Sequence, residues 1–216
     1  MSAKDIEAIV ALLKKEYPQA KIALRAVNPV ELLVATILSA QCTDQRVNIV
    51  TTSLFKKYAS VEDFARADIR SLEKEIRSTG FYRNKAKNIR GAAQKILKNF
   101  NGMVPDSMDE LIQLPGVARK TANIVLYNAF GKIEGIAVDT HVRRLSQRLG
   151  LSAHDDPEKI EEDLMGMLDR KGWGDFSNLL IEHGRRVCNA KKPRCPECVL
   201  KRLCHSRKIY FPKDDA

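Results

Sequence analysis

The stretch of sequence that decides the fold is Leu114-Pro115-Gly116-Val117-Ala118-Arg119-Lys120-Thr121-Ala122. Pro115 stops one helix and Gly116 permits a tight bend, so the segment is predicted to join two helices in a hairpin. The N–H groups of the turn and of the next helix then point outward. With the positive end of the helix dipole, they form a site that holds a phosphate without reading a base. An ordinary helical hairpin has the same pattern, so this stretch alone favours DNA binding only modestly.

Lys120 is the unusual residue of this stretch. It falls in the first turn of a helix that should begin near Val117, where the helix dipole disfavours a cation. With Arg119 next to it and partial burial, this position would favour the neutral amine, a nucleophile that can form a Schiff base. A lysine that only contacts phosphate is the simpler account of the residue at this point.

Helical periodicity dominates the rest of the chain. Apolar residues recur with the 3.6-residue period in residues 6–13, 89–96 and 160–168, and no stretch shows sustained two-residue alternation. We therefore expect an all-α protein with about ten short helices. Helix-start signals are Asn28-Pro29, Ser60 with Asp63, Asp68, Asp106-Ser107 and Asp156-Pro157. The length of 216 residues allows one large domain or two small ones, and spacing alone places no boundary.

The chain is strongly basic, with 37 Lys and Arg against 27 Asp and Glu and a formal net charge of +10. Such a charge suggests a polyanionic partner, nucleic acid before an acidic membrane. No stretch approaches the ~20 apolar residues that a spanning helix needs. Residues 1–10 do not resemble a signal peptide, so we expect a cytoplasmic protein. Ten of the Lys and Arg residues lie between residues 183 and 213, a window with one acid, Glu197.

Four of the five cysteines lie in this basic window: Cys188, Cys195, Cys198 and Cys204, spaced C-x6-C-x2-C-x5-C. The absence of a secretory signal argues against disulfides, and four soft sulfur ligands suit zinc or an iron–sulfur cluster. The x6 and x5 loops are longer than those of zinc ribbons, which places the cluster somewhat ahead of zinc. Cys42 stands apart at the end of an apolar helix and is expected to be a buried structural thiol.

Asp139 precedes a helix that should run to Leu149, and it is well placed to cap that helix. A carboxylate at this position could also stabilise a cationic sugar while it activates an amine. Both roles are compatible.

Five motifs together resemble the endonuclease III branch of the helix-hairpin-helix DNA glycosylases, across essentially the whole chain. They are residues 38–44 (LSAQCTD), residues 80–86 (GFYRNKA), the hairpin with Lys120, residues 138–141 (VDTH) and the cysteine series. The resemblance implies two α-helical domains with DNA in the groove between them. Residues 23–132 would form a six-helix barrel. Residues 1–22 and 133–216 would form a second domain, which holds a 4Fe–4S cluster on the four cysteines. Lys120 and Asp139 would face each other across the groove.

The resemblance also implies the chemistry of a bifunctional glycosylase and abasic-site lyase that excises oxidised pyrimidines from double-stranded DNA. The damaged nucleotide is flipped out, the Lys120 amine attacks C1′ with help from Asp139, and β-elimination from the Schiff base breaks the strand on the 3′ side. A monomer associated with the nucleoid is expected. The rival hypotheses are a non-catalytic DNA-binding module with structural zinc and an adenine-specific mismatch glycosylase, against which Lys120 argues.

Further residues are predicted to touch DNA. Gln41 matches a family position that enters the space left by the flipped nucleotide, although it could also simply end a helix. Phe81 sits where the family often has a leucine wedge, with core packing as the alternative. Lys85, Lys87 and Arg90 could hold phosphates or form a solvated helix face. The hairpin contacts are assigned to Leu114, Gly116, Ala118, Arg119 and Thr121.

The hairpin departs from the family pattern at Ala118, where the common form has a second glycine. If that position required a positive φ, alanine would cost ~1 kcal/mol or more. Because Ala118 directly precedes Arg119, we expect helical dihedral angles there and little penalty.

Overall fold

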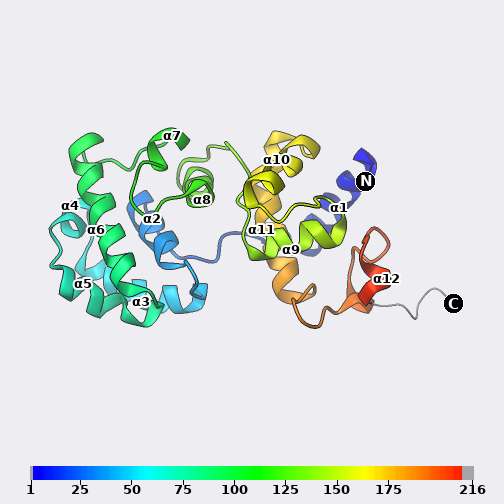
Figure 1. Cartoon of the computed structure of the whole chain (residues 1–216), viewed down its shortest axis with the longest axis horizontal. Helices are drawn as coiled ribbons and strands as arrows, with labels where there is room; N and C mark the ends of the chain where they lie inside the picture. The colour runs from blue at the N-terminus through cyan, green and yellow to red at the C-terminus, as the bar shows by residue number, and fades with distance from the viewer. Residues whose placement is uncertain (1, 211–216) are drawn as a thin grey trace. The chain divides into compact units, whose positions relative to one another are not determined.

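The computed structural model describes residues 2–210, and this part of the chain is all-helical, as the sequence predicts (Figure 1). The α-helices are α1 (Ala3–Glu16), α2 (Pro29–Leu38), α3 (Asp44–Lys57), α4 (Val61–Arg66), α5 (Ile69–Ile76), α6 (Tyr82–Asn99), α7 (Met108–Leu111), α8 (Arg119–Phe130), α9 (Thr140–Leu149), α10 (Pro157–Met167), α11 (Trp173–Arg186) and α12 (Arg207–Tyr210). Three 3-10 helices, η1 (Arg77–Thr79), η2 (Arg170–Gly172) and η3 (Cys195–Glu197), complete the described elements. The four-residue helices α7 and α12 are too short to show a periodicity in the sequence.

The predicted helix starts are confirmed where a side chain can accept a backbone N–H. Asn28, Asp68 and Asp156 each cap the helix that follows, and Ser60 with Asp63 forms a reciprocal capping box at α4. Ser107 precedes α7 without such a cap, and its hydroxyl donates to Oε2 of Glu110.

The chain divides into two compact units. The central unit is Ile22–Glu134, and the terminal unit combines Met1–Lys21 with Gly135–Ala216. These boundaries lie one to two residues from the expected ones at residues 22/23 and 132/133. Each unit has its own cluster of buried apolar side chains.

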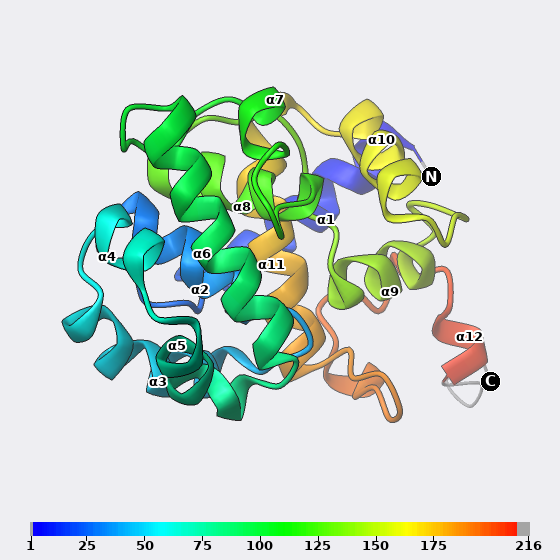
Figure 2. The ribbon, with the colours of Figure 1, turned by 60° about the vertical axis from the view of Figure 1, so that its left-hand side comes forward.

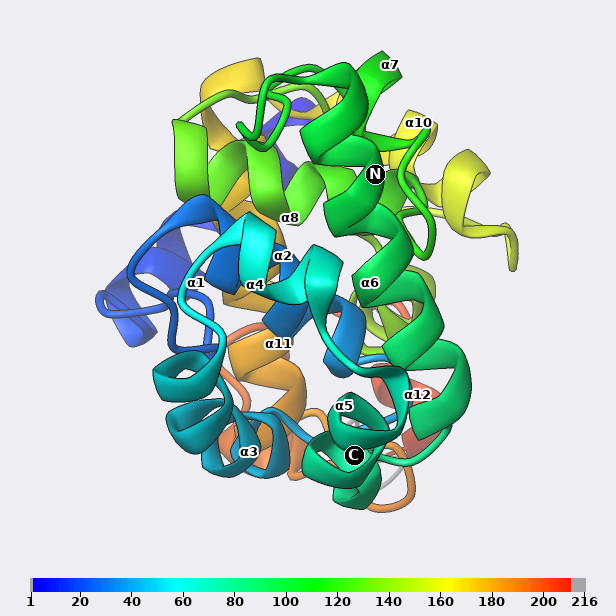
Figure 3. The same cartoon turned by 90° about the vertical axis from the view of Figure 1, so that its left-hand side faces the viewer.

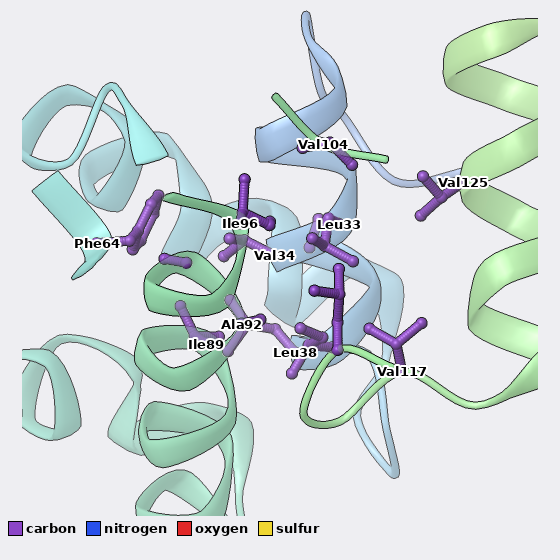
Figure 4. Close-up of a cluster of buried hydrophobic side chains, with 14 of the residues drawn as sticks. Leu33, Val34, Leu38, Phe64, Ile89, Ala92, Ile96, Val104, Val117 and Val125 are labelled. Atoms are coloured by element: carbon purple, nitrogen blue, oxygen red, sulfur yellow. The ribbon is translucent and has the colours of Figure 1, made fainter. Parts of the chain in front are cut away.

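The core of the central unit forms around α2, whose residues Leu32–Leu38 are all buried. Leu33, Val34 and Leu38 of this helix meet Ile89 and Ile96 of α6 in the core (Figure 4). Helices α4 and α5 pack along α6, and α8 packs on α2 (Figure 3). Each Å² of apolar surface that these side chains bury stabilises the fold by about 25 cal/mol. This burial is the main force that holds the unit together.

The terminal unit is built on α11, against which α9 and α1 pack (Figure 2). Phe176 and Leu180 of α11 are buried with Ile9 and Leu13 of α1 in the second apolar cluster. A Cβ at the position of Gly184 would lie 2.8 Å from Nδ1 of His141, so α11 approaches α9 closely only because this residue is glycine. The unit therefore unites the first helix of the chain with its last long one.

Candidate functional site

The predicted hairpin is present between α7 and α8. The amide of Leu114 donates to the carbonyl of Leu111 (3.0 Å), and the amide of Val117 donates to the carbonyl of Leu114 (3.1 Å). The side chain of Leu114 is only 2 % exposed, so it anchors the turn in the core. Gly116 has φ +79°, and a Cβ there would lie 2.8 Å from Cβ of Asn88 on α6. Both the backbone angle and the contact with α6 require glycine.

Ala118 differs from the expectation in its conformation. Its φ of −96° and ψ of 171° are extended rather than helical, and α8 begins at Arg119 rather than near Val117. The reason is that Ala118 is the N-cap residue, which precedes the helix and takes a β-region conformation. The second glycine of the common pattern is not needed here, because φ is negative and the backbone is unstrained. The methyl side chain of Ala118 cannot cap α8.

Lys120 is the second residue of α8 and its side chain is exposed, so the expectation of partial burial is wrong. Arg119 and Thr121 on either side of it are half-buried. The first-turn amides of a helix have no partner within the helix. Lys120 therefore presents an accessible amine on a helix end that attracts anions.

Asp139 caps α9, as predicted. Its Oδ1 accepts the amides of His141 and Val142, each at 2.8 Å, and the side chain is half-buried. Asp139 belongs to the terminal unit, whereas Lys120 and the hairpin belong to the central unit. The carboxylate is held in one orientation by two backbone donors, which makes it a pre-oriented negative charge.

Gln41 and Phe81 share an unusual backbone conformation. Their φ angles are +51° and +47°, in the left-handed region that non-glycine residues seldom adopt, and both side chains are exposed. Gln41 lies between α2 and α3, and Phe81 directly precedes α6. Phe81 is 62 % exposed, so the alternative that it packs in the core is wrong. Strained residues of this kind persist where the surrounding structure holds them, and they cluster at functional sites.

Lys85 contradicts the prediction that it holds a phosphate. It is 4 % exposed, and its Nζ donates to the carbonyl oxygens of Leu38 and Thr79, both at 2.8 Å. Lys87 is exposed and Arg90 is half-buried, so these two side chains remain on the surface of α6.

The four cysteines of the basic window line one pocket that opens to solvent, and none of them is in a disulfide. Nη1 of Arg148 donates to Sγ of Cys188 (3.3 Å), and Nε2 of His183 lies 3.4 Å from Sγ of Cys198. Within residues 2–210, no three His, Cys, Asp or Glu side chains are grouped as the ligands of a single ion would be. Cys42 is half-buried at the edge of the central core.

Burial raises the pKa of the Cys198 thiol to about 11 and also raises the pKa of the Cys195 and Cys204 thiols. Thiolates in this pocket therefore need a strong positive centre. Arg148 is the buried basic side chain that reaches a sulfur of this pocket, whereas Lys191, Lys192, Arg194, Lys201 and Arg202 are all exposed.

Sequence reasoning missed the side chains that hold the cysteine segment. Arg144 donates to the carbonyl oxygens of Gly184 and Cys188, and Arg148 donates to those of Asn189 and Ala190. The two arginines are four residues apart on one face of α9. That spacing is the signal that could have identified them, since buried arginines on one helix face must find acceptors.

None of the helices within residues 2–210 combines the length and apolar character that crossing a bilayer demands.

A family model described as the HhH-GPD superfamily of base excision DNA repair proteins matches residues 34–170. The chain belongs to this superfamily. It is 57% identical over 198 residues to endonuclease III of Synechocystis, which covers 92% of this chain and 90% of that protein. It is 45% identical to endonuclease III of Bacillus subtilis, over 94% of this chain and 93% of that protein. These similarities place it in the endonuclease III branch, whose members are base excision repair enzymes.

Solved structures agree with this assignment. A non-covalent complex of endonuclease III with DNA superposes with a TM-score of 0.94 at 43% identity, over 99% of this chain and 100% of that one. A trapped covalent intermediate of endonuclease III with DNA gives a TM-score of 0.92 at 43% identity, over 97% of this chain and 98% of that one.

Proposed function

We propose that this DNA glycosylase and abasic-site lyase excises oxidised pyrimidines from double-stranded DNA, with Lys120 as the nucleophile and Asp139 as its partner. The observation that carries the proposal is the exposed Lys120 amine in the first turn of the hairpin helix. The covalent intermediate trapped for a relative 43% identical to this chain supports the same type of chemistry.

The reaction begins with a nucleotide turned out of the base stack, because C1′ cannot be attacked inside a duplex. The amine of Lys120 forms a bond to C1′ and gives up a proton through Asp139, while the bond from C1′ to the damaged base breaks and the released base takes up a proton. The carboxylate of Asp139 stabilises the positive charge that develops on the sugar. It is already oriented by the amides of His141 and Val142.

Strand cleavage follows from the same covalent bond. The sugar ring then opens: the bond from C1′ to the ring oxygen breaks, the oxygen takes up a proton, and C1′ becomes an iminium with Lys120, which makes the C2′ proton acidic. Loss of that proton expels the 3′ phosphate by β-elimination. Water then hydrolyses the imine and restores the lysine.

We also propose that the hairpin holds the DNA backbone while Gln41 and Phe81 enter the duplex. The backbone amides of Gly116 and Ala118 lie at a turn shaped by Gly116 and next to the amino end of α8, together with Arg119 and Thr121. Leu114 contributes by anchoring this turn. The exposed Gln41 and Phe81 have the accessibility that an inserting side chain needs.

The cysteine pocket fits an iron–sulfur cluster. Four unpaired thiols around one pocket are the donor set of a 4Fe–4S cluster. Burial raises the pKa of three of these thiols, those of Cys195, Cys198 and Cys204, so a cationic group is needed to stabilise their thiolates. When bound, the cluster supplies a cross-link between Cys188, Cys195, Cys198 and Cys204. The exposed lysines and arginines between these ligands then form a basic loop that contacts DNA phosphates. This surface also supports association of a monomer with the nucleoid.

Borohydride trapping on a duplex with thymine glycol tests the catalytic proposal. The parent protein should form a covalent adduct, and Lys120→Ala should form none. Lys98→Ala is the matched control, since Lys98 is an exposed lysine near the end of α6. A parent that traps only a pre-formed abasic site would leave the lyase intact and refute the choice of damaged base. Equal trapping by Lys120→Ala would refute the assignment of the nucleophile.

The cofactor is tested separately by iron and zinc analysis and by the broad absorbance near 400 nm, which zinc does not give. Cys198→Ser should lower folding yield and DNA affinity more than it lowers the lyase rate of folded protein. Zinc without iron, or a lost lyase rate at unchanged DNA affinity, would contradict the cluster and its structural role.

A further inference from the structure

Lys85 is a buried cation whose two described acceptors are both backbone carbonyls. Its side chain is buried on α6, and its Nζ donates to the carbonyl oxygens of Leu38 and Thr79. Burial lowers the pKa of Lys85. Burying an ammonium group is costly unless its hydrogen bonds compensate, so these two bonds are needed to keep the residue inside.

The two carbonyls belong to the segments that carry Gln41 and Phe81. Leu38 is the last residue of α2, three positions before Gln41, and Thr79 is the last residue of η1, two positions before Phe81. The backbone amide of Lys85 also donates to the carbonyl of Phe81, at 3.1 Å. One lysine therefore links both segments, which are distant in the sequence but share one buried ammonium group.

The strained backbone of both tips explains why such a link is useful. The left-handed φ angles at Gln41 and Phe81 are unfavourable for residues other than glycine and persist only when the surroundings enforce them. A fixed point at the base of each segment limits the conformations into which the tip can relax. Preorganised tips avoid an entropic cost at the moment when they enter DNA.

We propose that Lys85 is a positioning residue that fixes Gln41 and Phe81 relative to each other for joint insertion into the duplex. This inference rests on the proposed insertion roles of those two residues. It assigns to Lys85 a function in the interior of the protein rather than at a phosphate.

Lys85→Met tests this, with Lys87→Met as the matched control. Methionine keeps much of the apolar length but cannot donate, and Lys87 is an exposed lysine on the same helix. Lys85→Met should lower the single-turnover rate of excision from a duplex roughly tenfold, as expected for misplaced contact groups. It should leave the lyase rate on a single-stranded abasic oligonucleotide unchanged, since no duplex is entered there.

Salt dependence separates positioning from loss of charge. Lys87→Met is expected to weaken binding and to reduce the salt slope by about one, whereas Lys85→Met should leave the salt slope unchanged. A salt slope that falls by about one for Lys85→Met, or equal losses on both substrates for this variant, would overturn the proposal.

A mutant cycle excludes a purely structural effect. In a Gln41→Ala/Phe81→Ala background, Lys85→Met should change the duplex rate by less than about twofold, because the groups it positions are gone. An undiminished loss in that background would refute positioning. If Gln41→Ala/Phe81→Ala alone leaves the duplex rate at the parent value, the proposed insertion roles are refuted, and this inference is refuted with them. The proposal that Lys120 is the nucleophile would be unaffected, because borohydride trapping tests it separately.

Folding of the variants is followed by thermal unfolding. If Lys85→Met does not fold, Lys85→Gln replaces it, because the glutamine amide can still donate a hydrogen bond. Lys85→Gln should give an excision rate on the duplex that is measurable but below the parent rate. Lys85→Gln at the full parent rate in the same assay would contradict the need for both bonds.

Discussion

Gly116→Ala gives the sharpest test of the hairpin geometry, because two independent penalties meet at this residue. The φ of +79° is disfavoured for alanine by about 1–2 kcal/mol. The new methyl group would also lie 2.8 Å from both Cβ and Nδ2 of Asn88, which forces α6 and the turn apart. Overpacking of this kind costs about 1–3 kcal/mol. The expected loss of unfolding free energy is therefore about 2–5 kcal/mol.

Gly131→Ala is the matched control for the backbone term. Gly131 ends α8 with φ +66°, and a Cβ there meets no atom within 4 Å. Its substitution should cost only the backbone penalty of about 1–2 kcal/mol. Asn88→Gly in the Gly116→Ala background removes the opposing Cβ, so the pair should show a favourable coupling of about 1–3 kcal/mol.

Urea unfolding followed by far-ultraviolet circular dichroism measures these values, with hydrogen exchange in α6 and α8 to locate them. The single tryptophan, Trp173, lies in the terminal unit, so its fluorescence does not report on the hairpin. A Gly116→Ala loss equal to that of Gly131→Ala would refute the close approach of the turn to Asn88. Absence of coupling between Gly116→Ala and Asn88→Gly would independently refute this close approach.

Substitutions at three further features test the two units one feature at a time. Asp139→Ala should destabilise the terminal unit by about 1 kcal/mol through loss of the α9 cap, as Trp173 fluorescence in urea will show. Asp139→Asn should retain the cap but lose excision activity, as single-turnover assays will show. Gly184→Ala should cost about 1–3 kcal/mol because its methyl group displaces His141, while Gly166→Ala in α10, where nothing lies within 4 Å, should cost nothing. The Ser60 hydroxyl lowers the pKa of Asp63, so the stability that this carboxylate contributes is present above its ordinary pKa of 3.8 and is lost as the pH falls below it. Asp63→Asn should therefore make the stability of the central unit less sensitive to acid below that pH. If urea titrations show the same loss of stability with acid in the parent and in Asp63→Asn, the proposed contribution of this carboxylate is refuted.

Local rules are enough to predict the helices and most of their ends. Asn28, Asp68 and Asp139 cap helices for reasons that lie within four residues of sequence, and Gly116 takes the left-handed turn that its position requires. The extended conformation of Ala118 differs from the prediction because α8 starts two residues later than the sequence pattern indicates.

The burial of Lys85 depends on contacts that are distant in sequence. Lys85 precedes Ile89, Ala92 and Ile96 by four, seven and eleven residues, a helical spacing that places it on the buried face of α6. Because lysine is charged, this spacing is easily overlooked in the sequence. The acceptor at Leu38, 47 residues away, could not be inferred from local pattern. The exposure of Lys120 likewise depends on the packing around α8 rather than on its own neighbours.

The terminal unit has a consequence for synthesis of the chain. Helix α1 packs on α11, and the hydroxyl of Tyr17 lies 2.9 Å from Nδ1 of His183, so the first helix must wait for residues made 166 positions later. At roughly 5–20 residues per second, this delay lasts about 8–30 s. Within that time the whole central unit, residues 22–134, is made and can fold, while Ile9 and Leu13 still lack the surface that buries them. The four clustered cysteines, between residues 188 and 204, are made after the whole central unit, so the cluster that we propose would be delivered to a chain in which that unit can already be folded.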